Sequence, residues 1–243
     1  NKEMVDSCET IKIPALSNLA DPGTIDANGE MSDVTPATEG VSSLDLDQQK
    51  GYKLNFPDYL SLTSKYRLKD DYSKKASYGV TKVMEDFIAA FHSQAGNTIG
   101  DVASFVSYPL LLRGVRILNQ ANAPMEDRAL ALDPLNFEAL LQEGVLVEAQ
   151  SVAWSKEDSP ILTARIKMAA GVGIVWSNSI VNAAGQVNNM LFTKDAIRLA
   201  ILRDVKVEQF ARQRFADSFG VSAFYGGLVE RSAELVRLIS KPS

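Results

Sequence analysis

One long amphipathic segment constrains the fold of this chain more than any other feature. Residues 68–94 contain no proline, and their apolar side chains recur every three or four positions. These side chains are Ala76, Val80, Val83, Met84, Phe87, Ile88 and Phe91. The spacing predicts a single helix over 68–95, roughly 40 Å long at about 1.5 Å per residue. Such a helix is longer than a compact domain needs for its own support, so we expect it to act as a spine.

Composition excludes several classes of protein. The chain has 243 residues, 46% of them hydrophobic and 23% charged, so it can bury a core and is neither disordered nor fibrous. A net charge of −5 and a pI near 5.1 argue against a dedicated nucleic-acid reader, which is usually basic on one face. The single cysteine, Cys8, excludes an intrachain disulfide and indicates a reducing compartment. No apolar run reaches the roughly 18 residues of a membrane span, so we expect a soluble protein without a membrane partner.

The region 15–50 has the pattern of a projecting arm. Residues 9–14 alternate apolar and polar side chains, which predicts a short strand ended by Pro14. Residues 16–43 are polar, rich in turn-forming residues and poor in large apolar ones. Alternation resumes over 44–56 and predicts a second strand that pairs with the first. We interpret the region as a β-hairpin arm, and a disordered loop is the alternative.

The rest of the chain mixes predicted helices and strands. Helices are expected over 58–65, 110–122, 137–142 and 193–202, the last with Thr193 as N-cap. Strands are expected over 128–132, 162–168, 173–180, 190–192, 205–210, 221–229 and 235–239. The last two strands are expected to pair, Ile174 and Trp176 to face inward, and 97–106 and 182–189 to be connections. This mixture predicts an α+β fold with helices packed on a sheet.

Residues able to carry out catalysis or bind a metal are sparse. His92 is the only histidine, and we interpret it as a helix-end residue because the helix dipole favours a cation there. The pair Gly171 and Gly173 lacks the third glycine and the following helix of a dinucleotide loop, so we attribute it to a crowded turn. The sequence contains no phosphate-binding loop and no Cys/His spacing suited to zinc. It therefore predicts no enzymatic activity, no cofactor and no metal.

A cluster of basic residues marks the first half of the predicted spine helix. Its members are Lys65, Arg67, Lys69, Lys74, Lys75 and Lys82. Positive charge concentrated in an acidic chain indicates contact with phosphates or with the acidic arm of a neighbouring subunit. The acidic residues of the arm are Asp21, Asp26, Glu30 and Asp33. The alternative is an ordinary solvated helix face, which is also how we interpret Asp70, Asp71, Glu85 and Asp86.

Three blocks of the sequence resemble one protein family. Residues 8–14, Cys-Glu-Thr-Ile-Lys-Ile-Pro, resemble its Gly-Asp-Thr-apolar-x-apolar-Pro strand, with Cys8 and Glu9 in place of the first two residues. Residues 122–141 resemble its pattern of Asn-x-Pro, Arg, an apolar strand, Pro, an aromatic residue and Leu-Leu. The third block comprises 194–197, 225–226 and 229–231. Over most of its length the chain resembles the major capsid proteins of tailed bacteriophages, which have the Hong Kong 97-type fold.

The resemblance implies a division of the chain. Residues 1–14 would be the remnant of an N-terminal arm together with the first strand, and 15–50 an extended loop that lies over an adjacent subunit. The peripheral domain, which includes the spine helix, would comprise 51–103 and 187–214. The axial domain, an α/β unit around the fivefold and sixfold axes, would comprise 104–186 and 215–243.

The resemblance also implies partners and a location. The chain would assemble into hexamers and pentamers of an icosahedral head in the host cytoplasm and remain in the virion, with packaged double-stranded DNA in non-specific contact. Portal, scaffolding and decoration proteins would be further partners. An encapsulin-type nanocompartment shares the fold and is the nearest alternative, and a soluble α/β enzyme is the alternative of another class. A segment removed during maturation would account for the absence of an initiating methionine, and an incomplete sequence would account for it equally.

Overall fold

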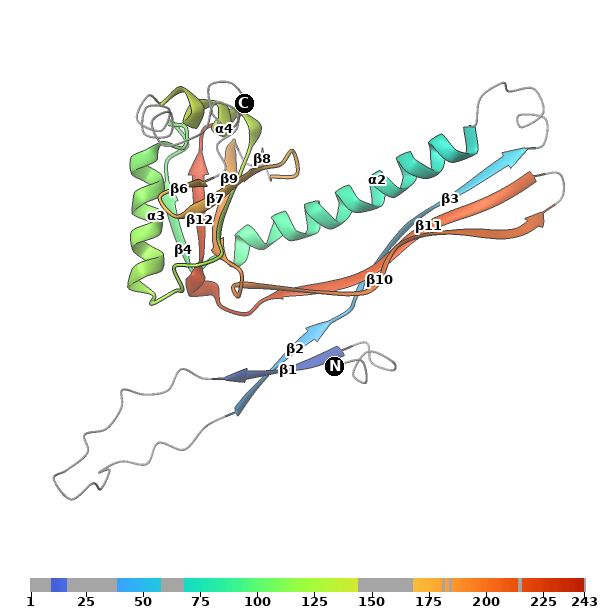
Figure 1. The fold of residues 1–243 in the computed structure, drawn as a ribbon, viewed down its shortest axis with the longest axis horizontal. Coiled ribbons are helices and arrows are strands. Elements are labelled where there is room, and N and C mark those ends of the chain that lie inside the picture. The colour runs from blue at the N-terminus through green and yellow to red at the C-terminus, as the bar shows by residue number, and fades with distance from the viewer. Residues whose placement is uncertain are drawn as a thin grey trace, which may run out of the picture.

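The structure is a computed structural model that describes residues 10–16, 39–57, 68–143, 168–180, 182–183, 185–213 and 216–242. It has three parts (Figure 1). Two strands form an arm ribbon, a long sheet carries the spine helix, and a wide sheet is packed against two shorter helices. The long sheet and its helix extend away from the wide sheet, and the arm ribbon lies below both in this view.

The arm ribbon consists of β1 (Thr10–Leu16) and β2 (Glu39–Asp45), which pair antiparallel. The first predicted strand does pair across the arm, but its partner is 39–45 and not most of the strand predicted over 44–56. Residues 17–38, which hold most of the arm, lie outside the described residues. The prediction that Pro14 ends the first strand is wrong, because Pro14 pairs with Val41 inside β1. A residue without an N–H is tolerated there because each strand of a two-stranded ribbon has a free edge.

The strand predicted over 44–56 is two strands in different sheets. The chain leaves the ribbon after Asp45, and β3 (Gln48–Pro57) joins the long sheet instead. The division falls where the backbone crosses β11 (Ala216–Val229), and Leu44 and Leu46 are both buried at this crossing. The polar residues 47–51 between the two apolar stretches gave no sign of this change of partner.

The long sheet is antiparallel, with the order β10-β11-β3, and its edge strand β10 spans Ile197–Gln213. The helix α2 (Leu68–Ala89) lies along this sheet and continues as the short 3₁₀ helix η2 (Ala90–Gln94). A helix over nearly all of the predicted range 68–95 is therefore confirmed, with a tighter last turn. Its core with the sheet comprises Ala76, Val80, Met84, Phe219, Val221, Ala223 and Tyr225.

Two predictions in the C-terminal third are wrong. Residues 193–202 do not form the predicted helix but the end of β9 (Gln186–Thr193), a turn and the start of β10. The residues of β10 pair with β11, and this tertiary pairing overrides their helix propensity. The strands predicted over 221–229 and 235–239 exist as β11 and β12 (Leu235–Ser240) but do not pair with one another. The 3₁₀ turn η3 (Ser232–Glu234) lies between them, and they belong to different sheets.

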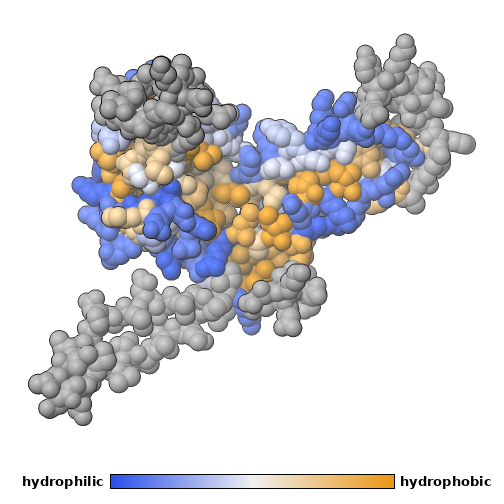
Figure 2. All heavy atoms as spheres, in the orientation of Figure 1, coloured by the Kyte–Doolittle hydropathy of each residue, from blue (hydrophilic) through white to orange (hydrophobic). Residues whose placement is uncertain are grey.

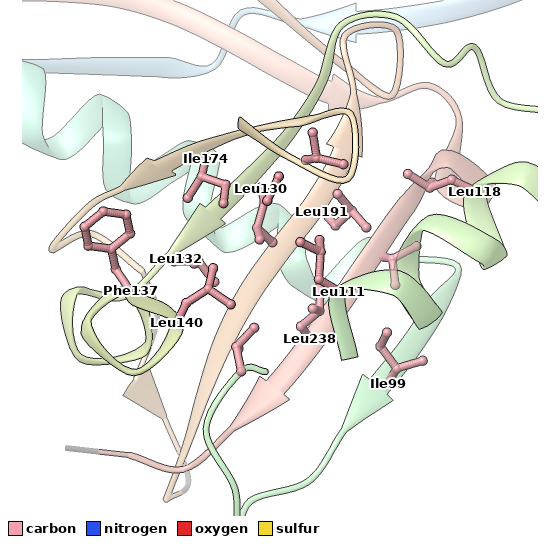
Figure 3. Close-up of a cluster of buried hydrophobic side chains, with 14 of the residues drawn as sticks. Ile99, Leu111, Leu118, Leu130, Leu132, Phe137, Leu140, Ile174, Leu191 and Leu238 are labelled. Carbon is pink, nitrogen blue, oxygen red and sulfur yellow. The ribbon is translucent and has the colours of Figure 1, made fainter. Parts of the chain in front are cut away.

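The wide sheet has the order β4-β12-β9-β5-β7-β6, with β8 beside β9. Its strands not yet defined are β4 (Asn97–Gly100), β5 (Arg128–Leu132), β6 (Met168–Ala169), β7 (Val172–Trp176) and β8 (Asn182–Ala183). The helices α3 (Tyr108–Gln120) and α4 (Pro134–Gln142) confirm two further predictions and contribute to one core with the strands (Figure 3). Asp133 caps α4, where its carboxylate accepts a hydrogen bond from the Leu135 amide at 3.1 Å.

Several smaller expectations need correction. The predicted connections contain strands β4 and β8 and the start of β9, because the sheet pairs them with β12 and with each other. Ile174 is buried as predicted, but Trp176 is 53% exposed because it ends β7 at the margin of the sheet. The helix predicted over 58–65 and most of the strand predicted over 162–168 lie outside the described residues.

The two sheets also cut across the boundaries expected at residues 187 and 215. The strand β9 belongs to the wide sheet, although it falls in the segment expected for the peripheral domain. The strand β11 belongs to the long sheet beneath α2, although it falls in the segment expected for the axial domain. In the described residues the chain therefore passes between the two sheets at other points than the resemblance led us to expect.

Candidate assembly surfaces

The arm ribbon is joined to the long sheet by a close crossing of two backbones. A Cβ atom on Gly226 would lie 2.1 Å from the carbonyl oxygen of Asp45, so β2 passes β11 at a point that admits only glycine. The Asp45 carboxylate also accepts a hydrogen bond from the Thr10 hydroxyl at 2.8 Å, which ties β1 to β2 at the same place. The base of the ribbon is thus fixed to the body.

An apolar row follows the edge strand of the long sheet. Among the described residues, β10 pairs only with β11, so its outer edge carries unpaired backbone groups. Its exposed apolar side chains are Leu199, Ile201, Leu202, Val207 and Phe210. Figure 2 shows apolar atoms as a band between α2 and the hydrophilic rim of this part of the molecule. An exposed apolar band beside an unpaired strand edge is typical of a surface that a partner covers.

The basic residues predicted as contacts have different surroundings in the structure. Lys69 forms an ion pair with Asp217 of β11, in a groove between the start of α2 and the long sheet. Lys74 and Lys75 are exposed on α2, with Lys82 two turns further along, and the Lys75 ammonium lies 5.8 Å from the centre of the Tyr72 ring. The remaining predicted contact residues lie outside the described residues: Asp21, Asp26, Glu30, Asp33, Lys65 and Arg67.

A buried carboxylate sits where the chain passes between the sheets. Glu234 is 6% exposed and accepts hydrogen bonds from the Thr193 hydroxyl at 2.5 Å and from the Arg231 guanidinium at 3.0 Å. The hydrogen bond with Glu234 is the largest of the influences that raise the pKa of Arg231. The amide of Gly96 donates to the Ser232 carbonyl at 2.8 Å, so the end of the spine helix is attached at the same junction.

Other buried polar side chains hold backbone in place. Asn189 accepts a hydrogen bond from the Asp133 amide and donates one to the Ser240 hydroxyl, both at 2.9 Å. The Arg128 guanidinium is buried and donates to the carbonyl oxygens of Pro124 and Ala123 at 2.7 and 2.8 Å. Each of these groups is engaged by neighbouring backbone or side chains, so their role in the described part of the chain is structural.

The described residues offer little for chemistry. No three His, Cys, Asp or Glu side chains among them are grouped so that they could hold a metal ion. His92 is half-buried, with its Nδ1 atom 3.0 Å from the Ala89 carbonyl oxygen at the end of the spine. In the same part of the chain, no helix is long and apolar enough to cross a membrane. The notable features are surfaces rather than a catalytic pocket.

Comparison with known proteins identifies the architecture. Neither a protein-family model nor a curated protein matches the sequence. A structure from Mycobacterium phage Che8 is similar, with a TM-score of 0.76 at 18% identity over 97% of this chain and 86% of that one. The capsid asymmetric unit of cyanophage Pam1 has the same TM-score at 10% identity, covering 99% of this chain and 87% of that one. A virus-like particle from Pyrococcus furiosus is less similar, with a TM-score of 0.60 at 13% identity over 95% and 86%.

This chain has the Hong Kong 97-type capsid fold. That fold was expected from three short sequence blocks, and two of them occupy defined positions in the wide sheet and the arm ribbon. The block at 122–141 contains β5 and most of α4, and the block at 8–14 contains most of β1.

Sequence reasoning missed two features of this Hong Kong 97-type fold. The apolar row on β10 has a strand signal, because Ile197, Leu199 and Ile201 alternate with other residues, but register shifts after Ile201 and Arg203 break the period. The second missed feature is the backbone crossing at Gly226. Nothing in the sequence shows that a second backbone lies against it.

Proposed function

We propose that this chain is the major capsid protein of a tailed bacteriophage, assembling into the hexamers and pentamers of an icosahedral head around double-stranded DNA. The observation that carries the proposal is the similarity of nearly the whole chain to the capsid subunit of cyanophage Pam1, at a TM-score of 0.76. The exposed apolar row on β10 supports it, because a subunit that stayed alone would leave that row in water.

The two sheets take different roles in this proposal. The long sheet and α2 form the peripheral domain, and the wide sheet with α3 and α4 forms the axial domain around the symmetry axes. This assignment moves β9 to the axial domain and β11 to the peripheral one, in accordance with their sheets. The arm lies over an adjacent subunit and covers its apolar row.

Charge favours the same contact between arm and neighbour. Residues 17–38 contain four acidic side chains and no basic one. The exposed side of α2 between Asp71 and Glu85 carries only the positive charges of Lys74, Lys75 and Lys82. An acidic arm lying on this face gains many weak contacts, which add up around a closed ring.

An encapsulin-type shell is the alternative. The observation in its favour is the similarity to the virus-like particle from Pyrococcus furiosus, whose TM-score of 0.60 is lower than the 0.76 of the cyanophage Pam1 capsid. The two possibilities differ in cargo. A phage head draws on portal, scaffolding and decoration proteins, is assembled in the host cytoplasm and encloses DNA. Shells recovered from infected cells with nuclease-protected DNA inside support the phage head, whereas shells filled with a protein cargo support the alternative.

Electron microscopy of the intact chain and an arm-shortened chain tests the proposal. Removal of residues 19–36 leaves both ribbon strands and joins them by a loop of residues 17, 18, 37 and 38. The intact chain is expected to form closed shells, and the arm-shortened chain to remain folded, with an unchanged circular dichroism spectrum, but unable to close a shell. Uniform small particles from the intact chain would contradict the proposal, and unfolding of the shortened chain would contradict the role given to the arm.

A further inference from the structure

Two unpartnered flanks of the wide sheet carry complementary chemistry. The first is the outer face of α3. Residues 102–125 contain only two charged side chains, Arg113 and Arg116, and both are exposed with no ion pair among the described residues. Leu112 lies beside them and is 43% exposed. We call Leu112, Arg113 and Arg116 the arginine flank. It offers two guanidinium groups beside an exposed apolar side chain.

The second flank lies at the other end of the wide sheet. The strand β6 pairs with β7 only as far as Gly173, so the rest of β7 has no outer neighbour among the described residues. Val175 and Trp176 are 58% and 53% exposed on this free part. Glu85 of α2 is exposed next to them, with Ser177 and Ser179 donating to its carboxylate at 3.4 and 3.5 Å. We call this set the tryptophan flank.

The two flanks cannot meet within one chain. The helix α3 packs over β4, β12 and β9, where a Cβ on Gly114 would lie 3.5 Å from Ile99 of β4 and 2.8 Å from Leu191 of β9. Those strands begin the sheet order, and β7 lies toward its opposite end. Figure 1 shows α3 on the outer side of the wide sheet, while α2 lies on the other side. Of the described residues, the two flanks can therefore meet only when they belong to different molecules.

We propose that the arginine flank of one copy packs on the tryptophan flank of the next copy. A guanidinium then lies over the indole of Trp176, another pairs with the Glu85 carboxylate, and Leu112 covers Val175. Because the surfaces differ and lie on opposite sides, each copy binds one neighbour with each flank. Such head-to-tail contacts close into rings, as the axial domain of a capsomer requires. Trp and Arg side chains are also the residues that most often dominate interface energies.

This inference rests on the proposed shell function, and crosslinking separates the two. In a chain with Cys8→Ser, the substitutions Arg116→Cys and Trp176→Cys place one thiol on each flank. A short bis-maleimide is the suitable reagent, because an Arg–Trp contact holds the two backbones too far apart for a disulfide. Assembled protein is expected to give a ladder on a denaturing gel that ends in covalent pentamers and hexamers. Each single-cysteine chain is expected to remain monomeric on the gel.

The possible outcomes lead to different conclusions. Shells without a ladder overturn the ring contact and leave the shell function intact. Dimers from the Trp176→Cys chain alone also overturn it, because they show like surfaces meeting. Absence of shells from the unsubstituted chain counts against the proposed function itself.

Charge reversal supplies a second test that needs no cysteine. Arg113→Glu with Arg116→Glu is expected to lower the yield of sedimenting shells at least about tenfold, because two carboxylates then face Glu85. Adding Glu85→Lys restores the opposite charges and is expected to recover most of the yield. The matched control Glu126→Lys, at another exposed position, is expected to change nothing. Full assembly of the variant with both arginines replaced by glutamate would overturn the contact, and so would failure of Glu85→Lys to recover the yield.

Discussion

The ring of Tyr225 meets the ring of Phe87 edge to face, with centroids 5.4 Å apart, and this contact joins the long sheet to the spine helix. Tyr225 is fully buried, and its hydroxyl has no hydrogen-bond partner in the described part of the chain. A buried polar group without a partner costs about 1–3 kcal/mol. We therefore expect Tyr225→Phe to leave the free energy of unfolding unchanged or to raise it by about 1 kcal/mol, as measured by urea unfolding of the arm-shortened subunit.

The same tyrosine predicts a loss of stability in alkali. Burial, followed by the negative charge of Asp86, raises the pKa of Tyr225 above its ordinary value of 10.0. Below about pH 10 the hydroxyl is protonated in both states, but above it the unfolded chain releases the proton first. The free energy of unfolding therefore keeps its full value below about pH 10 and falls as the pH rises from there through the folded-state pKa of Tyr225. The fall in unfolding free energy between about pH 9 and pH 11 should be smaller for Tyr225→Phe, and equal falls would show that Tyr225 is not responsible.

Gly226→Ala should destabilise the joint between the arm ribbon and the body. The added Cβ would overlap the carbonyl of Asp45, so β2 or β11 must shift, at a cost of about 1–3 kcal/mol. Hydrogen exchange is expected to speed up in β2 and in the first residues of β3. Gly173→Ala is the matched control in β7, because its Cβ would meet nothing closer than 3.5 Å. Equal exchange rates in both variants would contradict the crossing.

Glu234 should couple energetically to Thr193. Glu234→Ala removes the buried acceptor of two hydrogen bonds, and we expect a loss of about 2 kcal/mol, moderated because Arg231 is 45% exposed at its side chain. Thr193→Val removes the hydroxyl donor alone. A double-mutant cycle is expected to give a coupling energy above about 0.5 kcal/mol. Additive effects of the two substitutions would show that this hydrogen bond does not stabilise the junction.

Ile201→Lys should separate assembly from folding. Ile201 is 46% exposed on β10, so a lysine there can reach water and leave the melting temperature of the subunit nearly unchanged. In a shell the same position would be covered, and burying the ammonium would prevent closure. Light scattering of the assembly reaction measures the effect, with Ile201→Val as the control that assembles. Normal assembly of Ile201→Lys would show that the apolar row stays in water.

The sequence predicts this fold well where one element contains its own signal. The stripe from Ala76 to Phe91 predicts α2, and the run from Arg128 to Leu132 predicts β5 at its observed bounds. The sequence predicts the fold poorly where the conformation of a segment depends on the strand that it pairs with. Leu199 to Leu202 resembles a helix because bulges interrupt the alternation of β10, and only β11 determines its conformation.

The surfaces depend on contacts that are distant in sequence. Lys69 could be recognised as basic, but its partner Asp217 lies far along the chain. Trp176 is a large apolar residue of the kind expected in a core, but it is exposed at the end of β7. Arg113 and Arg116 gave no periodic or motif signal, and their importance appears only when both ends of the wide sheet are known.

Sedimentation velocity of the unmodified chain at rising concentration tests the central claim most directly. A subunit of 26.5 kDa with an exposed apolar strand edge should disappear from solution into one large, narrowly distributed species, the closed shell. A species that stays near 26.5 kDa at every concentration would contradict the account.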